Sequence, residues 1–206
     1  MRKFVPAYEG NLRKHALSVP RCISECSGIR VFGRRIKSLV FSTDVAIIKN
    51  INADAIIAVY PFTPQPAITQ AIIGVSEVPV FCGVGGGLTN GIRSASMAAY
   101  VEHQGAYGVV CNSKIGVETI HAIKDAVEIP VVYTVISENT DIQPYLTAGV
   151  DIINVSGAAR TPEIVGALRQ RYPELPIIAT GGPTEESILA TIRAGANAIT
   201  YTPPSS

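Results

Sequence analysis

The chain has 206 residues, of which 47% are hydrophobic and 16% are charged. This balance predicts one globular domain with a full core and excludes disorder as the main state. The formal net charge of +1 excludes a global field that would attract nucleic acid or an anionic membrane, so we expect neither as a partner. A small basic cluster is interpreted as a solvated face, and it comprises Arg30, Arg34, Arg35 and Lys37.

The sequence carries no sign of export or of a metal site. No apolar run approaches the roughly 18 residues of a membrane span, and the N-terminal residues lack the apolar stretch of a secretory signal. The four cysteines show neither CxxC spacing nor a Cys/His ligand pattern. We therefore expect a cytoplasmic protein with reduced thiols at Cys22, Cys26, Cys82 and Cys111.

Residues 1–35 differ from the regular pattern that follows them. Residues 11–25 carry a partial apolar stripe that predicts a helix, despite the proline at position 20. Residues 28–35 predict a short extended piece and a turn. We interpret this part of the chain as an N-terminal helix and extension.

From residue 36 onward, short apolar runs alternate with helix-length segments. The runs are continuous and not alternating, which is typical of parallel strands that are covered on both faces. Expected strands span 38–41, 55–59, 78–82, 108–111, 129–134, 151–155, 177–179 and 196–202. Expected helices span 45–51, 65–74, 90–104, 117–127 and 141–148, and two more begin near 161 and 183.

An internal sequence repeat determines the predicted topology. Related tetrapeptides open three strands at 78–81, 129–132 and 175–178, and a second set recurs at 53–56, 106–109, 150–153 and 196–199. The unit is therefore βαβα, used four times. Four units predict eight parallel strands and a single (β/α)8 TIM barrel over residues 36–206, with an open doubly wound sheet as the alternative.

The last predicted strand is followed by only a few residues, so we expect the eighth outer helix to be absent. The predicted helix at 11–25 is our candidate to occupy its place beside the first strand. A barrel that is open at this position would tend to associate through it, and we therefore expect a homo-oligomer.

Barrels of this kind bind ligands at the carboxyl ends of their strands. Three charged residues follow predicted strands and are our candidate catalytic groups, namely Lys114, Glu138 and Asp44. A lysine of lowered pKa forms Schiff bases, and carboxylates serve as general acids or bases. The alternative for Lys114 is a solvated surface role. All three histidines fall in predicted helices, away from these strand ends.

Glycine turns provide candidate anion sites. Gly181 and Gly182 precede a helix, where free N–H groups and the helix dipole favour an anion. Gly85 and Gly86 lie in a second turn that is a candidate ligand contact. The alternative for both turns is a tight bend that needs positive φ. Further candidate ligand-binding residues at strand ends are Thr180, Arg160, Ser156 and Asn112.

The sequences ATGG at 179–182 and GANAITYT at 195–202 resemble the aldolase-type, phosphate-binding TIM barrels. These include keto-deoxy-phosphogluconate aldolase, thiamine-phosphate synthase and the flavin-dependent nitronate monooxygenases. The resemblance implies a phosphate on Gly181 and Gly182. Two features depart from the family: Pro203 and Pro204 stand where the second half of the phosphate site is expected, and strand six, DIINVSG, lacks the aldolase lysine.

Three functions remain open at this level. The first is a small-molecule enzyme of aldolase or isomerase type that acts on a phosphorylated or carboxylated metabolite, without a cofactor. The second is an FMN-binding oxidoreductase with its phosphate on the same glycines. The third is a non-catalytic, ligand-sensing barrel.

Overall fold

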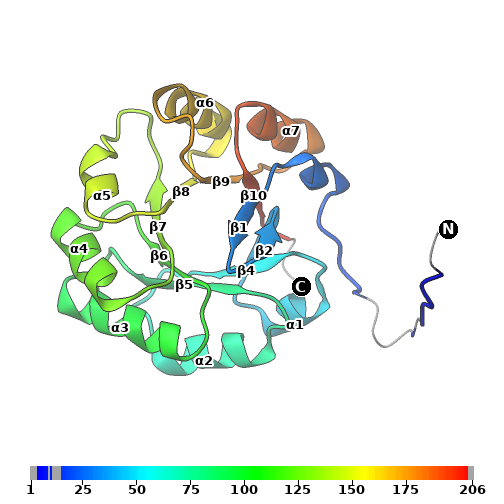
Figure 1. Cartoon of the computed structure of the whole chain (residues 1–206), viewed down its shortest axis with the longest axis horizontal. Coiled ribbons are helices and arrows are strands. Elements are labelled where there is room, and N and C mark those ends of the chain that lie inside the picture. Colours follow the sequence, from blue (N-terminus) through cyan, green and yellow to red (C-terminus); the bar gives the residue numbers. More distant parts are fainter. Residues whose placement is uncertain (1–3, 9, 11–14, 204–206) are drawn as a thin grey trace.

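Eight parallel strands close into a barrel in the computed structural model, which describes residues 4–8, 10 and 15–203 (Figure 1). The order around the ring is β3 to β10 in sequence, and β10 pairs with β3 to close it. The strands are β3 (Ser38–Phe41), β4 (Ala55–Ala58), β5 (Val80–Gly85), β6 (Gly108–Cys111), β7 (Val131–Val135), β8 (Ile152–Val155), β9 (Ile177–Thr180) and β10 (Ala198–Tyr201). This confirms the predicted (β/α)8 barrel and rules out the open sheet.

Helices form an outer ring around the strands, as Figure 1 shows along the barrel. They are α1 (Val45–Asn50), α2 (Pro66–Val75), α3 (Ile92–His103), α4 (Val117–Ala126), α5 (Gln143–Thr147), α6 (Thr161–Arg171) and α7 (Glu185–Arg193), with a short 3-10 helix η3 (Ala158–Arg160) before α6. Outward-facing strand residues and the apolar helix faces share one core. None of the helices in the described part of the chain combines the length and apolar character that a membrane-spanning helix needs.

A recurring hydrogen bond at the N-terminal end of the barrel accounts for the internal sequence repeat. Each βαβα repeat contains two strands. In three of the four repeats, the side chain of the residue just before the second strand accepts a hydrogen bond from the backbone N–H of the first residue of the first strand. The bonds are Ser38 N to Asp54 Oδ2 (3.0 Å), Val131 N to Asp151 Oδ2 (2.9 Å) and Ile177 N to Asn197 Oδ1 (2.9 Å). A buried or half-buried strand end needs such a partner, so the polar residue recurs.

The N-terminal extension forms a hairpin of β1 (Ile29–Val31) and β2 (Arg34–Ile36), as residues 28–35 predicted. Val31 and Ile36 are buried in the same cluster as the inward-facing strand residues. The hairpin therefore closes the N-terminal end of the barrel interior. The opposite end, where the strands finish, is left open.

The predicted helix at 11–25 is wrong for residues 15–20, and residues 11–14 lie outside the described part. Leu17 exchanges backbone hydrogen bonds with Asn50 and Asn52, beyond which Pro20 is extended. Among residues 15–25, only the 3-10 helix η2 (Arg21–Glu25) forms, and it packs on α7. The N-terminal segment thus lies between α1 and α7, where the eighth helix would be, but mainly as an extended chain (Figure 1).

A second difference concerns the glycine-rich stretch after the third barrel strand. Gly83 and Gly85 belong to β5, which continues through them with a register shift against β6. A Cβ at Gly83 would approach Val59 Cγ2 to 3.2 Å, so glycine allows the two strands to pack closely there. The expected loop begins later, at Gly86.

Replacement of Asp54 tests the recurring bond. We expect Asp54→Ala to lower the free energy of unfolding by about 2 kcal/mol, because Ser38 and Lys37 lose the acceptor of their N–H groups. Urea unfolding followed by circular dichroism measures this. Asp125→Ala is the control, since Asp125 pairs only across an exposed helix surface with His121 and should cost about 0.5 kcal/mol or less. Equal losses in both variants would contradict the role assigned to Asp54.

Candidate functional site

Alternate residues of each barrel strand point inward, and their character changes along the barrel axis. Near the closed end the inward residues are apolar, and they include Leu39, Phe81, Val132, Ile152 and Ile178. Two residues further along several strands, the inward positions become polar. The change from apolar to polar side chains defines the floor of a pocket at the carboxyl ends of the strands.

This mouth pocket has a volume of about 390 Å³, within the usual range for small-molecule sites. Its polar half comes from the ends of β6 to β10 and the residues that follow them. The residues of this half are Asn112, Ser113, Thr134, Asn154, Ser156, Thr180, Thr200 and Thr202. Within the described ranges, no Asp, Glu, Lys, Arg or His lines the mouth pocket.

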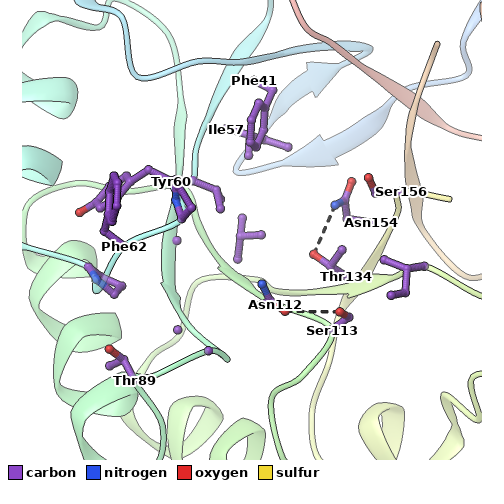
Figure 2. Close-up of a pocket in the computed structure, with 18 of the residues that line it drawn as sticks. Phe41, Ile57, Tyr60, Phe62, Thr89, Asn112, Ser113, Thr134, Asn154 and Ser156 are labelled. Atoms are coloured by element: carbon purple, nitrogen blue, oxygen red, sulfur yellow. Dashed lines mark hydrogen bonds between the residues drawn. The ribbon is translucent and has the colours of Figure 1, made fainter. Parts of the chain in front are cut away.

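The other half of the mouth pocket is apolar. Phe41 of β3 and Ile57 of β4 line it, together with Val59 and the loop 60–64 that follows β4. In Figure 2, Tyr60 and Phe62 lie on one side of the cavity, and Asn154 and Ser156 lie on the other. The pocket is therefore amphipathic across its width.

Two buried oxygen atoms of the polar half have no hydrogen-bond partner among the residues that the structure describes. They are Asn154 Oδ1 and Thr200 Oγ1, the latter on a side chain that is only 5% exposed. The amide nitrogen of Asn154 donates to Thr134 Oγ1 at 3.3 Å, and this contact leaves the oxygen free (Figure 2). Unpartnered buried polar atoms are rare, and in a pocket they indicate a place for a ligand's complementary groups.

Four of the residues predicted from the sequence do line the mouth pocket, namely Thr180, Ser156, Gly85 and Asn112. Thr180 and Ser156 come from neighbouring strands, and their hydroxyl oxygens are 3.4 Å apart. The remaining predicted residues are not among those that line it. Gly86 is one of these, since a Cβ there would lie 2.9 Å from Asn112 N, which shows that the residue packs against the end of β6.

Two candidate catalytic residues have local structural roles outside the pocket. Asp44 is the N-cap of α1 and accepts hydrogen bonds from Ala46 N (2.8 Å) and Ile47 N (3.3 Å). Lys114 is exposed, and its backbone N–H donates to Asn112 Oδ1 at 3.1 Å. Neither side chain lines the mouth pocket.

The third candidate, Glu138, forms an ion pair with Arg160, which also contacts Glu163 at 3.3 Å. The pKa of Glu138 is lowered, first by its own backbone N–H and then by the hydrogen bond from Arg160. A carboxyl that serves as a general acid near neutral pH needs the opposite shift. Arg160, in turn, is already paired with two carboxylates outside the mouth pocket.

The turn at Gly181 and Gly182 borders a second cavity of about 580 Å³, which shares Thr202 with the mouth pocket. Both glycines have structural explanations. Gly181 allows close packing, because a Cβ would lie 2.8 Å from Ile188 Cγ1 and from Ile199 Cγ2. Gly182 has a φ of 82°, which favours glycine.

The N-terminus of α7 already uses several of its donors. Gly181 N donates to Thr200 O, and the capping box of Thr184 and Ser187 uses both of their N–H groups. The pKa of Glu186 is lowered, first by its own backbone N–H and then by the Thr184 hydroxyl, so a carboxylate already stands at this helix end.

These contacts bear on the phosphate, and hence the FMN, that the family resemblance implies. Arg21 lines the second cavity, but Glu185 does too, and Pro203 supplies no N–H there. The residues present therefore do not fit a phosphate group, and we derive no step through FMN.

The thiols are not available as nucleophiles. All four cysteines are free and buried, and burial raises the pKa of Cys82 and Cys111 to about 12. Within the described residues, no three His, Cys, Asp or Glu side chains gather where a metal ion could bind. His15 lies outside any helix, contrary to prediction, while His103 and His121 lie in α3 and α4.

Sequence reasoning missed the residues that give the mouth pocket its character. Asn154 interrupts an apolar strand, and Thr200 has the same position in β10. A polar residue inside a continuous apolar run was the available signal. Phe62 and Leu88 lie in loops, and no sequence signal placed them over the mouth.

The closed parallel barrel with a pocket at its carboxyl end defines the chain as a TIM barrel. No protein-family model and no curated protein matches the sequence. Solved structures show which proteins share its architecture.

The chain is similar to phosphonopyruvate hydrolase in complex with oxalate and Mg²⁺, at 16% identity and a TM-score of 0.65 over 82% of this chain and 76% of that one. It is similar to phosphoenolpyruvate phosphomutase from Streptomyces platensis subsp. rosaceus, at 15% identity and a TM-score of 0.64 over 80% and 75%. A mandelate oxidase gives 15% identity and a TM-score of 0.64 over 86% and 68%. At identities this low, the similarity establishes the fold alone, which is a TIM barrel.

The unpartnered hydroxyl at the pocket floor leads to a stability prediction. We expect Thr200→Val to raise the free energy of unfolding by about 1 kcal/mol, because valine keeps the shape and removes a buried, unsatisfied oxygen. Thr161→Val is the matched control, since the equally buried Thr161 hydroxyl accepts a bond from Gly157 N at 3.0 Å and its loss should destabilise. Urea unfolding of both variants measures these changes in the free energy of unfolding. Destabilisation by Thr200→Val would show that its hydroxyl has a partner in solution.

The end of α7 provides a prediction about anions. We expect inorganic phosphate to bind the wild-type protein too weakly for calorimetric detection, because the Glu186 carboxylate already engages its own backbone N–H and the Thr184 hydroxyl at this helix end. Glu186→Ala should give measurable binding, and Glu163→Ala, which removes an acid from the first turn of α6, should not. Saturable phosphate binding by the wild type would contradict this assignment.

Proposed function

We propose that the chain is a small-molecule-binding barrel whose ligand lies in the mouth pocket and is held by uncharged hydrogen-bonding side chains. The observation that carries the proposal is the composition of the pocket lining. Its polar half consists of hydroxyl and amide groups, and two of their oxygen atoms lack partners. A ligand with its own donors would complete these contacts.

The same lining argues against acid–base or Schiff-base chemistry at this site. Both need a titratable group within hydrogen-bond reach of the substrate. The candidates Lys114, Glu138 and Asp44 are not among the lining residues, and Glu138 is engaged by Arg160. The function proposed is accordingly that of a ligand-sensing or ligand-carrying barrel.

A second candidate is supported by the fold comparisons and by the sequence resemblance. The similar structures include phosphonopyruvate hydrolase with oxalate and Mg²⁺ and phosphoenolpyruvate phosphomutase, which are enzymes. They favour a metabolic enzyme that acts on a small anionic substrate. Hydroxyl and amide donors of the mouth pocket would then hold the anion.

Benzamide and benzoate form a matched pair of probes that separates the two candidates. They have the same size and shape and differ in the charge of the polar group. We expect benzamide at millimolar concentration to raise the melting temperature of the protein and benzoate to have at least about threefold weaker affinity, because none of the described residues that line the pocket is a cation.

The measurement is a thermal shift with affinities from two-dimensional NMR titration. Resonances of Thr134 and Thr180 should move, whereas those of Phe32, at the opposite end of the barrel, should not. Tighter binding of benzoate than of benzamide would overturn the neutral-ligand proposal and favour the anion-binding enzyme.

A further inference from the structure

We infer that the ligand of the mouth pocket is an uncharged amphiphile, with an amide or hydroxyl head on Asn154 and Thr200 and an apolar body against Phe62, Leu88 and Ile136. This inference rests on the proposed function, and it adds the chemical class and the orientation of the ligand. Two independent features of the pocket support it: the unsatisfied atoms at the floor and the exposed apolar side chains at the rim.

The unpartnered polar atoms at the floor of the mouth pocket indicate the chemistry of the ligand's head group. Asn154 Oδ1 is an acceptor that needs a donor, and the Thr200 hydroxyl both donates and accepts. These side chains come from β8 and β10, on either side of β9. A primary amide or a hydroxyl group supplies a donor and an acceptor together, whereas a carboxylate supplies no donor to Asn154.

The apolar side chains at the rim of the mouth pocket indicate that the body of the ligand is apolar. Phe62 is 73% exposed, Leu88 is 95% exposed and Ile136 is 57% exposed, yet all three line the mouth pocket. They come from three separate strand ends, so they surround the opening and do not form a single stripe. Apolar ligand surface that covers them leaves water, which is the main favourable term for such contacts.

The width of the pocket determines the orientation. Apart from Val110 and Ile136, the lining residues on β6 to β10 and just after them are polar, and the apolar half lies on β3, β4 and the loop 60–64. Figure 2 shows Phe41 and Phe62 apart from the group formed by Thr134 and Asn154. A ligand that is polar at one end and apolar at the other satisfies both halves only with its head on the β8–β10 side.

Three related probes test this assignment on the wild-type chain. Benzamide has both parts, acetamide has the head alone, and N,N-dimethylbenzamide has the body and an acceptor but no donor. We expect benzamide to bind about tenfold more tightly than either of the others, since each lacks one set of contacts. NMR titration measures all three dissociation constants.

Two variants locate the contacts, each with a matched control. Thr200→Val should weaken benzamide binding about three- to tenfold, and it should weaken dimethylbenzamide, which keeps only the carbonyl acceptor, by no more than that factor. Phe62→Ser should weaken both aromatic probes and leave acetamide unchanged. Thr161→Val and Phe32→Ser alter a buried hydroxyl and an exposed phenylalanine away from the pocket, and both should bind every probe as the wild type does.

The outcomes separate this inference from the proposed function. Benzamide binding that is equal to that of dimethylbenzamide, or insensitive to both Thr200→Val and Phe62→Ser, would overturn the amphiphile assignment and leave a neutral-ligand barrel. Absence of binding by benzamide and acetamide, with all variants folded by circular dichroism, would overturn the proposed function and this inference with it.

Discussion

Closure of the parallel sheet is the constraint on which the rest of this structure depends. When β10 pairs with β3, no strand edge remains, and every strand has one face inside the ring and one face under the helices. Both faces must then be filled, which explains the continuous apolar runs. At the closed end the β1–β2 hairpin completes the filling with Val31 and Ile36. At the open end nothing equivalent covers the interior in the described part of the chain, and the inward-facing side chains become a pocket.

The chemistry of the pocket follows from where charge can be accommodated. A charged side chain inside the barrel would need a partner and full hydrogen bonding, because an isolated buried charge is costly. Here three carboxylates near the mouth have partners outside the pocket: Glu138 pairs with Arg160, Asp44 caps α1, and Glu186 lies at the start of α7. Among the described residues that line the mouth pocket, the polar side chains carry only hydroxyl or amide groups. Recognition by hydrogen bonds and apolar contact is what such a lining supports.

The sequence indicated some of the residues that line the mouth pocket. It missed others because side chains alternate between the two faces of a strand, and the sequence does not say which face a given residue occupies. Proximity to a strand end selected Ser156 and Thr180, which line the mouth pocket. It also selected Lys114, which lies three residues after β6 in a turn that directs its backbone N–H to Asn112. Sequence distance from a strand end does not say which face a residue occupies, and a shift of one residue moves a side chain from the interior to the helix layer. Asn154 was passed over because it lies within a strand and not after it.

The sequence by itself predicted the fourfold repeat and favoured a closed parallel barrel over an open sheet, because continuous apolar runs and the tetrapeptides that recur around Asp54, Asp151 and Asn197 are local signals. It did not determine how the N-terminal segment packs. Pairing of Leu17 with the end of α1, a contact between distant parts of the chain, replaces the predicted helix over residues 15–20. Only the tertiary structure decided which polar atoms are buried without partners. That property depends on the curvature of the barrel and on side chains from several strands meeting at one level.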